Sequence, residues 1–70
     1  MENKIKEFGL RVKQLRKEYG YSQEDLANKM GVHRTYVGMI ERGEKNLTLL
    51  KIYQLANALE LDIKELFDLL

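Results

Sequence analysis

Apolar residues recur every three or four positions along the whole chain, and glycines or polar capping residues separate the stretches in which they recur. This spacing, together with few β-branched residues and no proline, predicts helices rather than strands. We therefore expect one compact all-α domain that occupies residues 1–70. Its five predicted helices cover about residues 5–19, 23–30, 34–42, 49–59 and 63–69.

The predicted helix boundaries carry recognisable signals. Ser22, with Asp25 three residues later, forms a capping box before the second helix, and Gly31 can end that helix in a left-handed conformation. Thr48 should cap the fourth helix. The residues expected to face the core are Phe8, Val12, Leu15 and Tyr19 of the first helix and Leu49, Ile52, Leu55, Ala56 and Leu59 of the fourth.

Residues 22–43 combine the features of two short helices that cross at a steep angle. Ala27 is small where the backbones approach, Gly31 lies in the turn, and apolar residues occupy the inward positions Leu26, Met30, Val32, Val37 and Ile40. This is the pattern of a DNA-binding helix-turn-helix, whose second helix lies in the major groove. A purely structural helical hairpin inside a larger bundle is the alternative interpretation.

The second helix of this unit should turn its polar residues outward, namely Arg34, Thr35, Gly38 and Arg42. The first turn of such a helix reaches base edges, where Arg34 can pair with guanine and Thr35 can contact a base or a thymine methyl group. Gly38 would allow close approach to the groove floor, and Tyr36 could hold Arg34 or contact a phosphate. Ordinary solvation of a helix start is the alternative explanation for Arg34 and Thr35.

Polar residues around the outward helix are expected to contact the DNA backbone. These are His33, Arg42, Lys45 and Asn46, which lie at helix ends or in the following loop. Such contacts set affinity and salt dependence rather than sequence choice. His33 stands at an N-cap position, where histidine is not a preferred residue. A structural compromise at the helix start therefore explains His33 as well as a phosphate contact does.

Charge and composition narrow the function. The net charge is only +1, but residues 1–45 hold ten Lys/Arg against seven Asp/Glu, whereas residues 46–70 hold two against four. A basic N-terminal part and an acidic C-terminal part suit a protein that faces phosphate on one side.

With one histidine, no cysteine and no glycine-rich phosphate loop, we expect no metal, no cofactor, no small-molecule site and no enzymatic activity. No apolar run approaches the ~20 residues of a membrane span, and no signal-peptide core is present, which predicts a cytoplasmic protein.

The C-terminal part carries more apolar residues than its short helices can bury. The surplus residues are Leu50, Tyr53, Phe67, Leu69 and Leu70. Exposed apolar patches usually mark a partner surface, so we expect a homodimer formed through these residues. A frayed C-terminus is the alternative. The same surface supports a second hypothesis for function, a protein-interaction module of the antitoxin or anti-repressor type.

Three stretches, LRKEYGYSQEDLANKMGV, IERG and NLTLLKIYQLANAL, resemble the phage-repressor and Cro-type helix-turn-helix domain. The stretch HRTYVGMIERGEKNLTL is more specifically similar to controller proteins of restriction–modification systems. The resemblance implies a lambda-repressor-like fold and a small dimeric transcriptional regulator that binds roughly palindromic operators beside its own genes.

The same resemblance implies roles for individual residues. It makes Arg34, Thr35 and Tyr36 the base readers, places Gln23 against the DNA backbone, and pairs Arg16 of the first helix with Glu41. Two positions depart from the family, which often has proline where Leu47 stands and serine, threonine or aspartate where His33 stands. We therefore expect local differences at the starts of the third and fourth helices.

Overall fold

The computed structural model describes residues 2–69, and for Glu2 the backbone alone. In this part of the chain the elements are α1 (Glu2–Glu18), α2 (Gln23–Met30), α3 (Arg34–Glu41), α4 (Leu49–Leu59) and α5 (Ile63–Leu66), with no strand among them. The expected all-α fold is therefore confirmed. None of these helices is both long and apolar enough to cross a lipid bilayer.

The helix ends agree with the prediction to within one residue except at the two ends of the chain. α2 and α4 have the predicted bounds, α3 is one residue shorter, and α1 starts three residues earlier than expected. The predicted helix over 63–69 is too long, because α5 ends at Leu66. Phe67 leaves the helical region, and the N–H of Leu69 donates to the carbonyl of Phe67 at 2.8 Å. The chain after α5 is thus a turn rather than a helix.

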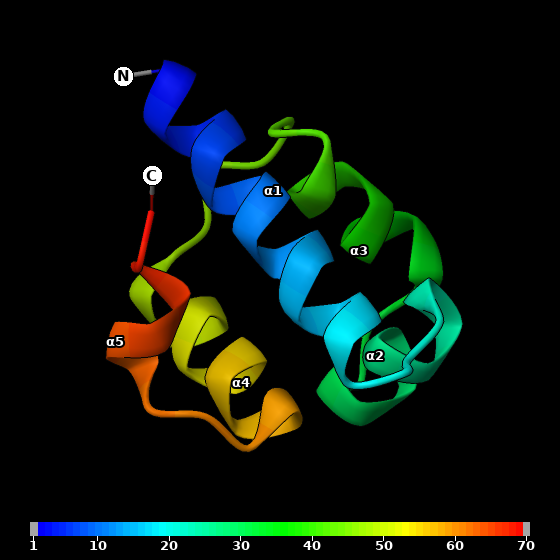
Figure 1. Cartoon of the computed structure of the whole chain (residues 1–70). Coiled ribbons are helices and arrows are strands. Elements are labelled where there is room, and N and C mark those ends of the chain that lie inside the picture. The colour runs from blue at the N-terminus through cyan, green and yellow to red at the C-terminus, as the bar shows by residue number, and fades with distance from the viewer. Residues whose placement is uncertain (1, 70) are drawn as a thin grey trace.

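α1 crosses the molecule diagonally in Figure 1. α3 packs against α1, α2 packs against both α3 and α4, and α5 packs against α4 and α1. Each helix supplies at least one fully buried side chain to a single core. These side chains are Val12 of α1, Leu26 of α2, Val37 and Ile40 of α3, Leu55 of α4 and Leu66 of α5. Burial of this shared core is the main force that holds five short helices together.

The predicted capping signals are present. Ser22 Oγ accepts the N–H of Asp25 at 3.0 Å, and the Asp25 carboxylate accepts the N–H of Ser22 at 2.9 Å. These hydrogen bonds hold the pKa of Asp25 below its usual value. Gly31 ends α2 with a φ of 74°, and Thr48 Oγ1 accepts the N–H of Lys51 at 3.2 Å. Local sequence therefore fixes where α2 and α4 begin and where α2 stops.

Two residues that were expected in the core lie on the surface. Tyr19 is 45% exposed, because α1 ends at Glu18 and its periodicity does not extend further. Leu49 is 67% exposed, because it is the first residue of α4 and stands at the edge of the core. Both predictions extended the helical spacing of apolar residues to positions that no other helix of the described chain covers.

Candidate nucleic-acid interface

α2 and α3 form the helix-turn-helix, and its inner contacts are as the spacing predicted. Leu26, Ala27 and Val37 are buried between the helices, and Val32 in the turn packs against the core. The N–H of Val32 donates to the carbonyl of Ala27 at 2.9 Å, which closes the turn after Gly31. This packing fixes the direction in which α3 presents its other face.

The first turn of α3 is open to solvent. Arg34 and Thr35 are both exposed, as the sequence predicted. Arg34 lies 3.6 Å from the carboxylate of Glu24 in α2, and both side chains are about two-thirds exposed. An ion pair this exposed is weak and does not restrain the guanidinium strongly. Arg34 is thus held near α2 but remains free to reach another acceptor.

His33 caps α3 through its ring. Its Nδ1 accepts the N–H of Thr35 at 3.1 Å, in place of the oxygen that a serine or aspartate would supply. The presence of His33 at this position is therefore explained by its structural role as the N-cap of α3. Its ring is exposed, and a phosphate contact stays a prediction.

Tyr36 is half-buried, and its ring lies near two lysines rather than near Arg34. Lys45 Nζ is 5.7 Å and Lys51 Nζ is 5.8 Å from the centre of its ring. The expectation that Tyr36 holds Arg34 does not describe this structure, because Arg34 turns toward Glu24 instead. Sequence reasoning missed Lys51, since nothing local indicates that α4 brings it to the same ring as Lys45.

Gly38 is buried, so the expectation that it faces outward is wrong. A Cβ at this position would lie 3.0 Å from Nη1 of Arg42 and 3.7 Å from Oε1 of Gln23. The two side chains therefore cover Gly38. Arg42 also pairs with Glu44, with Nε–Oε2 at 2.9 Å and Nη2–Oε1 at 3.2 Å. This contact raises the pKa of Arg42 and lowers the pKa of Glu44.

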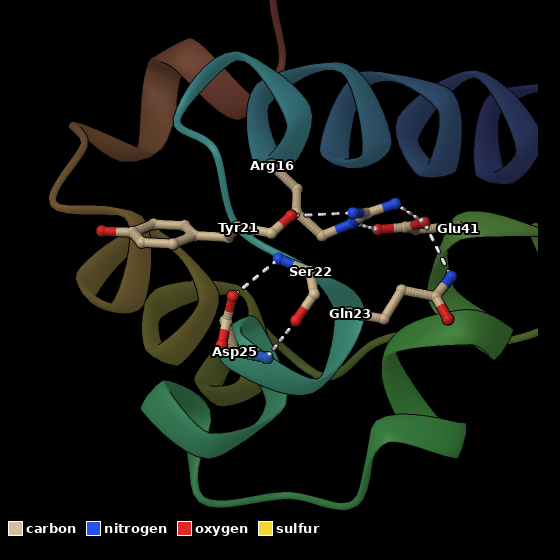
Figure 2. A network of polar contacts seen from close by, with 6 residues as sticks. All are labelled: Arg16, Tyr21, Ser22, Gln23, Asp25 and Glu41. Carbon is tan, nitrogen blue, oxygen red and sulfur yellow. Dashed lines mark hydrogen bonds and ion pairs between the residues drawn. The ribbon is translucent and has the colours of Figure 1, made fainter.

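Arg16 and Glu41 form the ion pair that the resemblance implied (Figure 2). The distances are 2.6 Å from Nε to Oε2 and 3.1 Å from Nη2 to Oε1, and both residues are buried. Arg16 Nη1 also donates to the carbonyl of Tyr21 at 2.8 Å. Gln23 Nε2 donates to Glu41 Oε1 at 3.1 Å. The network ties α1, the start of α2 and the end of α3 into one rigid unit.

Gly9 is a second link between α1 and α3 that sequence reasoning missed. A Cβ at this position would clash with the carbonyl oxygen of Ile40 and lie 2.8 Å from that of Glu41. The absent side chain lets α1 contact the backbone at the end of α3 directly. A glycine inside an otherwise regular helix was the available signal, because helix interiors normally exclude it.

The predicted apolar surface at the C-terminal end is present in the described residues. Leu50, Tyr53 and Phe67 are exposed by 68%, 49% and 50%. Leu69 is half-buried, and Leu70 lies outside the described residues. Phe67 and Leu69 line an apolar hollow of about 360 Å³, which we call the C-terminal hollow, together with Ile5, Phe8, Leu47 and Ile52.

Comparison with known proteins identifies the family to which the chain belongs. Residues 12–66 match the family model described as helix-turn-helix, which covers most of the chain. The chain belongs to the helix-turn-helix family. The match includes α2 and α3 completely, which favours the DNA-binding helix-turn-helix over a purely structural hairpin inside a larger bundle.

Several relatives of this helix-turn-helix protein are controller proteins, as the resemblance suggested. The control protein C.BamHI of Bacillus amyloliquefaciens is 42% identical over 62 residues, which cover 87% of this chain and 76% of that protein. The solved structure of the restriction–modification controller protein C.AhdI from Aeromonas hydrophila has 46% identity and a TM-score of 0.87, covering 90% of this chain and 96% of that one.

A third relative was solved with its ligand. The biofilm regulator SinR, crystallised in complex with DNA, matches with a TM-score of 0.79 and 37% identity over 87% of this chain and 98% of that one. Family and relatives together identify this helix-turn-helix protein as a DNA-binding transcriptional regulator.

Proposed function

We propose that the protein acts in the cytoplasm as a homodimeric controller of a restriction–modification system and binds a roughly palindromic operator. The observation that carries this proposal is the exposed first turn of α3 on a rigid support. Arg34 and Thr35 are exposed, while Glu41 at the other end of the same helix is buried and paired. Because α3 is already held at its far end, little additional ordering is needed when its first turn binds base edges.

Each outward residue then has a proposed role. Arg34 reads guanine, Thr35 contacts a neighbouring base, and the hydroxyl of Tyr36 reaches the DNA beside them. The surroundings of Tyr36 support this role, because Lys45 and Lys51 both lie close to the centre of its ring, at 5.7 Å and 5.8 Å, and add positive charge there. The residues proposed to contact the backbone are Gln23, His33, Arg42, Lys45 and Asn46.

The dimer is proposed from the exposed apolar residues. Leu50, Tyr53 and Phe67 lie on the half of the chain that carries net negative charge and that does not contain α3. A partner copy that covered them would leave both recognition helices free. Two α3 helices related by a twofold axis would meet major grooves about 34 Å apart, which requires a roughly palindromic site.

Selection of bound DNA from a random pool tests the operator directly. We expect a consensus with two inverted half-sites whose centres are about one helical turn apart. A consensus without inverted symmetry would contradict the dimer, and the absence of any consensus would contradict sequence-specific binding.

Substitution of Arg34 then tests the proposed reader. Arg34→Ala should weaken operator binding by about 1–3 kcal/mol. Arg34→Lys is the matched control, because it keeps the charge but loses the paired N–H groups that recognise guanine. It should lose discrimination at one base position yet bind random DNA as the wild type does. If neither variant changed operator binding while the apolar surface still bound a protein partner, the interaction-module hypothesis would be favoured.

A further inference from the structure

Arg42, the residue that follows α3, already has an anionic partner in the free protein. Its guanidinium makes two nearly parallel hydrogen bonds to Glu44, at 2.9 Å and 3.2 Å. The side chains of Arg42 and Glu44 are 57% and 49% exposed, so the pair stands at the surface. Two parallel N–H groups on two oxygens is also the way in which arginine binds a phosphate.

The paired guanidinium lies beside the recognition helix, close to Gly38 of α3 and Gln23 of α2. If Gly38 carried a Cβ, that atom would lie 3.0 Å from Nη1 of Arg42 and 3.7 Å from the amide oxygen of Gln23. Arg42 and Gln23 line a surface hollow of about 500 Å³ between α1 and α3, which we call the α1–α3 hollow. The other residues that line it are Lys6, Leu10, Lys13 and Glu41.

The charges around this hollow favour an anion. Lys6, Lys13 and Arg42 contribute three cations. Glu41 is the acidic residue of the lining, but it is buried and already accepts hydrogen bonds from Arg16 and Gln23. Glu44 lies outside the lining but occupies Nε and Nη2 of Arg42, so a phosphate that binds this edge with two hydrogen bonds has to replace it. One guanidinium edge cannot hold the carboxylate and the phosphate at the same time.

We propose that Glu44 is an internal competitor for the phosphate that Arg42 binds. On DNA, the Nε and Nη2 edge of Arg42 exchanges the Glu44 carboxylate for a backbone phosphate at the edge of the α1–α3 hollow, where Lys6 and Lys13 add positive charge. Glu44 thereby lowers the affinity for the DNA backbone and reduces its dependence on salt. The inference rests on the proposed function, since it requires that the α3 face binds duplex DNA.

The expected effect is small but measurable, because an exposed ion pair stabilises little. Removal of the competition by Glu44→Gln should tighten DNA binding about 1.5- to 5-fold. Loss of a negative charge near DNA would tighten binding by itself, so this single variant does not decide the question. The deciding quantity is whether the gain depends on Arg42.

A double-mutant cycle separates the two effects. Dissociation constants for the selected operator duplex are measured by fluorescence anisotropy at several salt concentrations, for the wild type, Glu44→Gln, Arg42→Ala and the double variant. We expect Glu44→Gln to tighten binding and steepen the salt dependence only where Arg42 is present. Glu60→Gln, at the far end of α4, is the control for net charge and should change binding little.

Equal tightening by Glu44→Gln in both backgrounds, or no tightening in either, would overturn the inference while leaving the proposed function intact. A wild type that binds no duplex DNA would overturn both. Circular dichroism of all four proteins should show unchanged helix content, because both side chains are at the surface.

Discussion

Replacement of Glu41 by glutamine should destabilise this protein strongly. The substitution keeps the shape of the side chain and removes the charge that faces Arg16. The Glu41 side chain is 3% exposed and that of Arg16 is 9% exposed, so the guanidinium would stay buried without a counterion. Breaking one partner of a buried pair typically costs about 3–5 kcal/mol.

This loss is large for a chain of this size. A domain of 70 residues has a stability of roughly 4–10 kcal/mol, at about 0.05–0.15 kcal/mol per residue. The variant should therefore lose a third or more of its stability and melt at least ~12 °C below the wild type. The hydrogen bond from Arg16 to the carbonyl of Tyr21 would remain, so the guanidinium would keep one of its partners.

The measurement is urea and thermal denaturation followed by circular dichroism. Glu44→Gln is the matched control, because it removes the same charge from an exposed ion pair and should melt close to the wild type. A double variant, Arg16→Met with Glu41→Leu, should recover much of the stability, since apolar side chains often replace a buried pair without loss. If Glu41→Gln and Glu44→Gln had the same melting temperature, the argument from burial would be refuted.

Three further predictions follow from other parts of the structure. Wild type at tens of micromolar should sediment as a dimer and Tyr53→Asp with Phe67→Asp as a monomer, and a monomeric wild type would contradict the proposed interface. Glu60 ends α4 with a φ of 56°, so Glu60→Gly should raise the free energy of unfolding in urea by about 1 kcal/mol. A loss of stability would show that this residue is not strained. The pKa of Asp25 is lowered in the folded state, mainly by the hydrogen bond from the backbone of Ser22. The carboxylate therefore stabilises the fold above the pKa of an unfolded aspartate, and this contribution disappears as the pH falls through the lowered value. Acid unfolding of Asp25→Asn should consequently depend less on pH than that of the wild type, and parallel curves would argue against this linkage.

The fold was predictable because it depends mostly on signals within one or two helical turns. The spacing of Leu26, Val37 and Ile40 fixed which faces are inward, and Ser22 and Gly31 fixed where α2 begins and ends. The prediction was wrong at Tyr19 and Leu49, where helical periodicity continued but the covering elements did not. Periodicity indicates the direction of a side chain, whereas its burial depends on what lies opposite.

The detailed contacts of the interface could not be predicted, because they join residues that are distant in sequence or depend on the conformation of long side chains. The sequence does not indicate that Lys51 reaches Tyr36, or that Gly9 lies under the carbonyls that end α3. Gly38 was expected to face outward because Val37 and Ile40 face inward, but the side chain of Arg42 folds back over it. The roles of Arg34 and Thr35 on DNA remain predictions that binding measurements must test.

The buried network at the end of α3 has a consequence for changing which operator the protein reads. Arg16, Glu41 and Gln23 position the helix from its far end and leave Arg34 and Thr35 out of the network. Randomised libraries at positions 34 and 35 should thus retain folded members at high frequency, and selection could retarget the regulator to new sites. Grafting α2 and α3 alone onto a foreign scaffold should fail, because the anchor belongs to α1.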